Sequence, residues 1–155
     1  MLPRKSDFRP GLCLAITLAA MFAGGCSSLS IKYSYDAHAT FPGLKTYKWV
    51  DAVVLPGRGP QDPLLETNVA HIADQNLASK GFTKSADAAD TIVWVGYDVE
   101  FDKHYQLRSL TLTIARADNK NIIWQGTAAG PIHTDAASKS LEEVVTRMLS
   151  SFPPK

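Results

Sequence analysis

TIVWVGYDVEF, residues 91–101, is the longest candidate strand in the sequence. Its first half, from Ile92 to Val95, is apolar without a break, whereas Asp98 and Glu100 alternate with apolar residues in its second half. An unbroken apolar run is typical of a strand buried on both faces, and alternation of polar and apolar residues is typical of a strand with one solvent-exposed face. We therefore expect a long strand that crosses the core and leaves it at its carboxyl end.

The residues after this stretch predict a hairpin. Leucine and isoleucine alternate with threonine between Leu110 and Ile114. Asp118 to Asn121 are turn-forming residues, and an apolar run from Ile122 to Ala128 follows them. Because a hairpin joins antiparallel strands, these two segments are expected to pair antiparallel.

Two shorter strands are expected before the long one. Residues 31–36 alternate in the strand manner, and residues 46–50 place Tyr47 and Trp49 on the same face. Phe41 to Gly43 is turn chemistry and separates the two.

Helical patterns account for the remaining regular segments. Asp62 and Pro63 predict a helix start, because a carboxylate caps free amides and proline suits the first helical position. This helix should end near Lys80, with Gly81 as its left-handed cap. The last segment carries apolar residues at spacings of three and four along one face, and Pro153-Pro154 stops it; these are Leu141, Val144, Val145, Met148, Leu149 and Phe152.

The order strand, strand, helix, three strands, helix predicts an α+β domain. We expect residues 31–155 to form a single domain, with a mainly antiparallel five-stranded sheet and both helices packed on one face. The composition of the 155 residues, 45% hydrophobic and 20% charged, agrees with one folded domain.

Residues 1–25 are ordered like a signal peptide. Arg4, Lys5 and Arg9 precede an uncharged, mostly apolar run from Gly11 to Gly25. This run is shorter than the ~20 residues that a helix needs to cross a bilayer, so cleavage is favoured over a permanent span.

The end of this leader, Phe22-Ala23-Gly24-Gly25-Cys26, resembles the lipobox of bacterial lipoprotein precursors, with Ala23 where leucine is usual. The resemblance implies cleavage between Gly25 and Cys26, and acyl chains on the thiol and amine of Cys26. Residues 26–30 then form the lipidated cysteine and a short tether. Ser27 implies, again by resemblance, a place in the periplasmic leaflet of the outer membrane. The other interpretation is an ordinary secretory signal with an incidental cysteine.

The whole domain resembles bacterial lipoproteins that carry the domain of unknown function 4136. The resemblance is carried by short motifs in a fixed order along nearly all of the mature chain, and it implies no reaction and no catalytic residues. These motifs are Tyr33 to Asp36, Phe41 to Trp49, Lys80-Gly81-Phe82, Ala89-Asp90, Trp124-Gln125-Gly126 and Phe152-Pro153-Pro154.

The charge, cysteine and histidine content indicates which partners, disulfides and cofactors are to be expected. The chain has 16 basic and 15 acidic residues, and the leader removes more basic than acidic ones, so no nucleic-acid partner is expected. Cys13 leaves with the leader, so the mature domain has no disulfide. Its four histidines, His38, His71, His104 and His133, lack metal-ligand spacing, and neither a metal nor another cofactor is expected beyond the lipid on Cys26.

No nucleophile motif is visible, so a non-enzymatic protein is expected. The alternative is a hydrolase of envelope polymers that uses Asp98, Glu100 and Asp102 on one strand face, although a wet sheet face explains these acids equally well. The chain's strand aromatics are either core or a continuous binding surface; they are Tyr33, Tyr35, Tyr47, Trp49, Trp94, Tyr97 and Trp124.

The polar loop after the long strand is the best candidate for partner contacts, because loops carry function more often than scaffolds do. The candidate partner-binding residues in it are Lys103, His104, Tyr105 and Arg108. The sequence thus predicts an envelope lipoprotein, anchored to membrane lipid through Cys26, whose domain faces the periplasm and binds or scaffolds an envelope protein or polymer.

Overall fold

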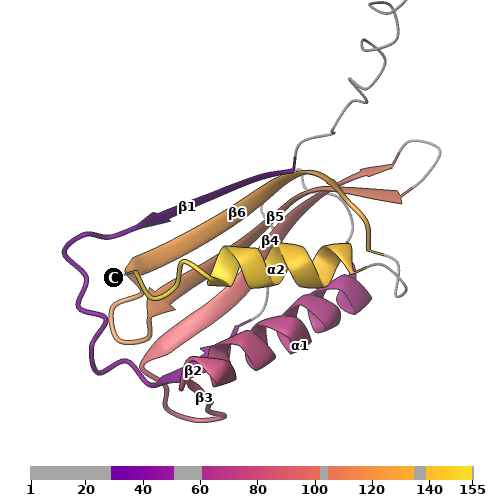
Figure 1. Ribbon diagram of the computed structural model, residues 1–155. Coiled ribbons are helices and arrows are strands. Elements are labelled where there is room, and N and C mark those ends of the chain that lie inside the picture. The colour runs from indigo at the N-terminus through magenta and orange to yellow at the C-terminus, as the bar shows by residue number, and fades with distance from the viewer. Residues whose placement is uncertain (1–28, 51–60, 102–104, 135–138, 155) are drawn as a thin grey trace, which may run out of the picture.

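The computed structural model describes residues 29–50, 61–101, 105–134 and 139–154. The predicted leader and cleavage site, with Gly25 and Cys26, lie outside these ranges. The regular elements are, in chain order, β1 (Ser30–Tyr35), β2 (Thr46–Trp49), α1 (Pro63–Ser79), β3 (Thr83–Lys84), β4 (Thr91–Phe101), β5 (Tyr105–Arg116), β6 (Ile122–Ile132) and α2 (Ser140–Leu149). The strands form one sheet in the order β1-β6-β5-β4-β2-β3, and both helices lie on the same face of it (Figure 1).

The predicted α+β class with two helices is confirmed, but the prediction of five mainly antiparallel strands is wrong. The sheet has six strands and is mixed, because β2 pairs in parallel with both β4 and β3. Helix α1 connects β2 to β3, and a helical crossover of this kind joins parallel strands. β3 was missed because its two residues, Thr83 and Lys84, are too short to show a periodicity.

The long central strand confirms the expected change of environment along its length. Val93 and Val95 are buried in one core cluster with residues of both helices, and Ile92, which alternates with them along the strand, is buried outside that cluster. Further along, Val99 is buried whereas Asp98 is exposed. β4 pairs antiparallel with β5 over its full length, and β5 pairs antiparallel with β6, so the expected hairpin is confirmed.

Helix α1 has the termini that its sequence predicts. The Asp62 carboxylate accepts a hydrogen bond of 2.9 Å from the backbone N–H of Leu65. At the other end Gly81 has a φ of 85°, and the N–H groups of Gly81 and Phe82 donate to the carbonyls of Ala78 and Leu77. This pair of hydrogen bonds ends the helix and turns the chain toward β3.

Helix α2 ends at Leu149, three residues before the apolar stripe does. Phe152 follows in a turn and is nevertheless buried, because it packs with the rings of Phe41, Phe82 and Trp124. The C-terminal segment thereby joins the start of the domain, the end of α1 and β6 in one aromatic cluster. No helix in the described ranges has the length and apolar character needed to cross a membrane.

Gly126 is needed beside this cluster because the indole ring of Trp124 lies over it. A Cβ atom at position 126 would stand 2.5 Å from Cη2 and 3.0 Å from Cζ2 of Trp124. Trp124 is completely buried and contacts Phe152, so its ring has little room to move. The motif Trp124-Gln125-Gly126 is therefore a packing unit.

Gly126→Ala is expected to lower the free energy of unfolding by ~1–3 kcal/mol, the usual cost of overpacking a core. Chemical denaturation followed by tryptophan fluorescence measures this change. An unfolding midpoint equal to that of the native protein would contradict the close approach of the indole ring to the Gly126 backbone.

Candidate functional site

The predicted partner loop falls mostly outside the described residues. Lys103 and His104 are not described, and Tyr105 begins β5, where its backbone is paired with Phe101. Arg108 is exposed on β5, at an irregularity in the pairing with β6. Partner binding at this end of the β4–β5 hairpin stays a prediction.

The acidic strand face is described only in part. Asp98 is exposed and lies opposite Ser109, and the register of β4 and β5 shifts between Asp98 and Val99. Glu100 lies on β4 with its backbone opposite Gln106, while Asp102 is outside the described residues. The described residues therefore do not establish a pair of carboxyl groups at the separation that glycoside hydrolysis requires.

Within the described ranges, no three His, Cys, Asp or Glu side chains are grouped so that they could hold a metal ion. His71 lies exposed on α1 and shares a hydrogen bond of 3.1 Å with Gln75. The expectation of a protein without a metal remains a prediction.

The strand aromatics are divided between core and surface. Tyr47, Tyr97 and Trp124 are buried, and Trp49 and Trp94 are half-buried. The two β1 tyrosines are largely exposed, Tyr33 to 59% and Tyr35 to 49%. The continuous aromatic surface considered from the sequence is therefore not formed, and its most accessible part lies on β1.

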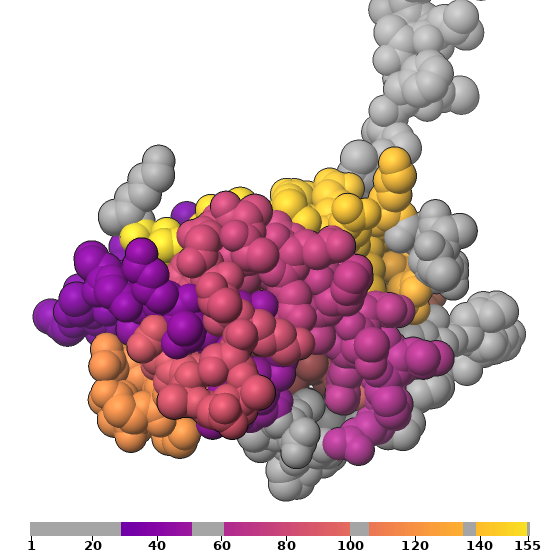
Figure 2. All heavy atoms as spheres, turned by 90° about the horizontal axis from the view of Figure 1, so that it is seen from below, coloured from indigo at the N-terminus to yellow at the C-terminus, as the bar shows by residue number. Residues whose placement is uncertain are grey.

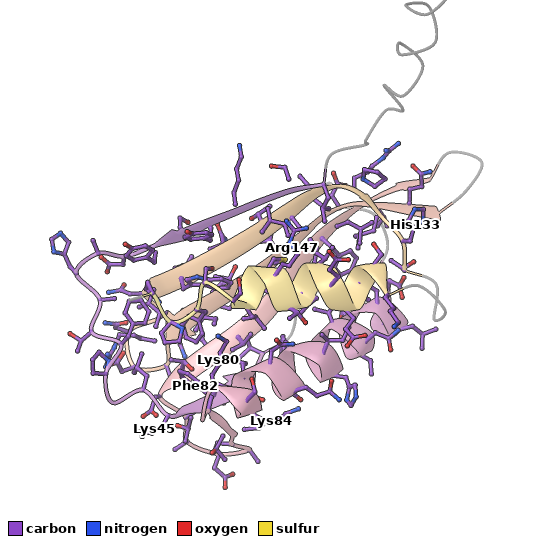
Figure 3. The ribbon with its side chains drawn as sticks, viewed as in Figure 1. Lys45, Lys80, Phe82, Lys84, His133 and Arg147 are labelled. Atoms are coloured by element: carbon purple, nitrogen blue, oxygen red, sulfur yellow. The ribbon has the colours of Figure 1, made fainter. Side chains whose placement is uncertain are left out.

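A carboxylate cluster joins α1 to the β2–β3 edge of the sheet. Asp74 on α1 accepts hydrogen bonds from the Tyr47 hydroxyl at 2.8 Å, from Trp49 Nε1 at 2.7 Å and from Lys84 Nζ at 2.9 Å. Lys84 lies on β3, just beyond the end of α1 (Figure 3). Seen from below, α1 and the residues after it form the middle of the surface on this side of the molecule (Figure 2).

The surroundings of Asp74 favour its ionised form. Partial burial alone would raise the pKa of Asp74, but the hydrogen bonds from Trp49, Lys84 and Tyr47 outweigh burial and hold it below its usual value. Burial, together with the bond to Asp74, raises the pKa of the Tyr47 hydroxyl, which stays protonated. A carboxylate that already accepts three hydrogen bonds is a poor base. The role of this cluster is structural, because its hydrogen bonds fix β2 and β3 to α1.

Asp74→Asn is expected to lower the free energy of unfolding at neutral pH by ~1–3 kcal/mol, because hydrogen bonds to a charged group are lost. A folded-state pKa below the unfolded value means that ionised Asp74 stabilises the protein above the unfolded pKa, and that this contribution disappears as the pH falls through the folded pKa. The difference between native and variant should therefore shrink below about pH 4. Urea denaturation at pH 7 and in acid measures this difference.

The matched control for Asp74→Asn is Asp87→Asn, at an exposed position on the loop before β4. It should leave stability within about 0.5 kcal/mol of the native protein at both pH values. A pH-independent loss at position 74, or an equal loss at both positions, would contradict the stabilising role of the Asp74 cluster.

A second carboxylate connects two of the short sequence motifs. Asp90 accepts hydrogen bonds of 2.8 Å from the backbone N–H groups of Lys45 and Thr46 and from the Thr46 hydroxyl. Its own N–H donates to Thr46 Oγ1. The two backbone donors, with the Thr46 hydroxyl, hold the pKa of Asp90 below its ordinary value. Asp90 thereby fixes the start of β2 against the start of β4.

The role of Asp74 was not predicted from the sequence. Asp74 lies three residues after His71, and this helical spacing is typical of two neighbouring residues on a solvated helix edge. His71 does lie there, whereas Asp74 faces the polar ends of Tyr47 and Trp49. The available signal was that both of these aromatics carry a hydrogen-bond donor at the tip, which needs a partner when it is buried.

These features define a class of protein: a small α+β domain with a mixed six-stranded sheet covered on one face by two helices, in which Asp74 and Asp90 connect separate elements through hydrogen bonds. The chain belongs to the family described as Domain of unknown function (DUF4136), whose model matches residues 31–154. No curated protein sequence matches the chain significantly.

Solved structures with similar folds share little sequence with this chain. A PDZ domain protein from Parabacteroides distasonis has a TM-score of 0.59 and 14% identity over 81% of this chain, which spans only 35% of that protein. The PelC dodecamer from Paraburkholderia phytofirmans has a TM-score of 0.55 and 14% identity, over 79% of this chain and 96% of PelC. A PelC dodecamer that carries a leucine-to-methionine substitution has a TM-score of 0.53 and 15% identity, over 79% and 95%. At these identities the likeness concerns the fold alone.

Proposed function

We propose that the protein is an envelope lipoprotein whose domain is held at a membrane by the acylated Cys26, with a binding or scaffolding role in the periplasm. The observation that carries this proposal is the position of the lipobox relative to the fold. Leu29 packs against the core and β1 begins at Ser30, so only Ser27 and Ser28 stand between Cys26 and the folded domain.

A tether this short keeps the domain close to the lipid headgroups. A fully extended chain spans at most ~3.6 Å per residue, so the two serines together add less than 10 Å or so. Several acyl chains anchor a protein far more firmly than the marginal single chain, because each buried methylene contributes ~0.8 kcal/mol. Ser27 after the cysteine supports the periplasmic leaflet of the outer membrane as the location.

Two further observations support a scaffolding or binding role over catalysis. Three carboxylates of the described residues have depressed pKa values, Asp74, Asp90 and Asp118, and each accepts hydrogen bonds from donors of its own chain. PelC, which has a similar fold, is a dodecamer, so this fold is compatible with assembly from identical copies. We therefore propose a non-enzymatic role, with self-assembly or an envelope partner as its basis.

The experiment is chemical cross-linking in intact envelopes followed by recovery of the tagged protein in detergent. The native protein is compared with Cys26→Ala and with variants that carry a photoreactive probe at His104 or Tyr105. The proposal predicts a reproducible cross-linked species, either another copy or an envelope component, that weakens strongly when Cys26 is replaced. Recovery of the protein alone from native envelopes would contradict a binding or scaffolding role.

A further inference from the structure

The two edges of the sheet differ in how much pairing they offer. One edge is β3, which has only two residues, and short edge strands are a common protection against unwanted pairing. The other edge is β1, Ser30–Tyr35, which has six residues and contains neither proline nor glycine (Figure 1). β1 pairs with β6 on one side, and no strand of the described part of the chain pairs with its other side.

The phase of the β1 hydrogen bonds follows from one backbone contact. The N–H of Asp36 donates to the carbonyl of Ile123 at 3.1 Å, in the same register as the pairing of Tyr35 with Trp124. Backbone groups alternate in direction along a strand, so Ser34 and Lys32 also face β6. The N–H and C=O groups of Tyr33 and Tyr35 consequently point away from the sheet and are available to another strand.

We propose that this free edge is a self-association site, at which β1 of one copy pairs antiparallel with β1 of a second copy about a two-fold axis at Ser34. In this register Tyr33 lies opposite Tyr35 of the other copy, and these are the residues whose backbone groups point outward. The register therefore satisfies the hydrogen-bond phase of both strands at once, with two hydrogen bonds at each of the two Tyr33–Tyr35 pairs.

In the same register, the β1 side chains of one copy complement the β1 side chains of the other copy. Lys32 lies opposite Asp36 of the second copy on one face, and both residues are exposed. Among the described residues, Lys32 forms no ion pair within its own chain. On the other face the exposed rings of Tyr33 and Tyr35 form two cross-strand aromatic pairs. Opposite charges and aromatic pairs directly across strands both stabilise antiparallel pairing.

This inference rests on the proposed function, because the association is expected to be strong enough only when both copies are held at one membrane. Five paired residues on each strand make a small interface, and interfaces of that kind are weak in solution. Confinement to one membrane raises the effective concentration of the two copies and favours association without any new contact. The short tether places β1 next to the anchor, where this confinement acts most directly.

The test is disulfide trapping in the lipidated protein, in the oxidising envelope. Ser34→Cys places two thiols on the two-fold axis, where the Cα atoms of a non-hydrogen-bonded antiparallel pair are about 4.5 Å apart, within disulfide range. Ser30→Cys is the matched control, because it lies on the same face of the same strand but roughly 27 Å from its counterpart in this register. The native chain controls for the reactivity of Cys26.

The proposal predicts a covalent homodimer with Ser34→Cys and only background with Ser30→Cys. In the Ser34→Cys protein, Lys32→Asp should reduce trapping roughly tenfold, because it places two pairs of like charges across the interface, and adding Asp36→Lys should restore trapping. No dimer at position 34, equal trapping at positions 30 and 34, or a disulfide to a different protein would overturn self-association through β1.

Fractionation of the same envelopes separates this inference from the proposed function. Membrane-bound protein that gives no Ser34→Cys dimer contradicts self-association through β1 and leaves the anchor intact. A specific Ser34→Cys dimer in the soluble fraction supports self-association and contradicts the anchor.

Discussion

Phe152→Ala is expected to lower the free energy of unfolding by ~3–5 kcal/mol, the usual cost of removing a buried phenylalanine ring. Phe152 is 1% exposed. Its ring centroid lies 5.3 Å from that of Phe82, 5.5 Å from that of Trp124 and 6.1 Å from that of Phe41. Because Phe152 follows the end of α2, alanine there removes the ring that holds this segment against three separate parts of the fold.

The measurement for Phe152→Ala is thermal and urea denaturation followed by tryptophan fluorescence. A loss of this size should lower Tm by roughly 10–20 °C in a domain of this length. Leu64→Ala is the control, because Leu64 is 77% exposed and its loss should change stability by less than about 0.5 kcal/mol. Equal small effects at the two positions would contradict the central role of the aromatic cluster.

Cys26→Ala is expected to abolish acylation completely, because alanine has no thiol to accept a lipid. Cells that express the native protein should incorporate a labelled fatty acid into it, and the variant should carry no label. The variant should also disappear from the outer membrane, since several acyl chains provide far more anchoring energy than any contact of the short polar tether.

Two controls separate acylation from other effects of Cys26→Ala. Ser28→Ala changes the tether next to the anchor and should leave labelling unchanged. The domain of Cys26→Ala should keep the native Tm, because position 26 precedes Leu29, the first described residue in contact with the core. Label retained by Cys26→Ala would contradict acylation at this residue.

The fold could be predicted wherever one segment carries a long, repeated signal. Residues 91–101 and the following hairpin show clear runs and alternation, and the structure places them at the centre of the sheet. The Asp62 cap and the Gly81 turn were equally visible, because each motif specifies its own local hydrogen bonds. In these segments the local sequence alone was sufficient to predict the structure.

Parallel pairing could not be predicted because it depends on segments far apart in the chain. The parallel alignment of β2 with β4 relies on Asp90, which binds the backbone of Lys45 and Thr46. No pattern within residues 46–50 contains that information. β3 likewise exists because Gly81 turns the chain beside β2, and its two residues carry no signal of their own.

The candidate sites show the same division between local and long-range information. The proposed lipobox is a contiguous motif, so the sequence alone is enough to predict it. The Asp74 cluster joins side chains from α1, β2 and β3 and became visible only in three dimensions. The free edge of β1 is a property of strand order, and the alternation of residues 31–36 gave no indication that this strand ends the sheet.

The most direct test of the lipid anchor is the mass of the amino-terminal peptide of the mature protein, purified from membranes in detergent and digested with trypsin. Acylation of Cys26 predicts a peptide from Cys26 to Lys32 whose mass exceeds that of its amino acids by a diacylglycerol and a further acyl chain. A peptide that begins at another residue, or one that begins at an unmodified Cys26, would contradict the lipid anchor and with it the proposed envelope role.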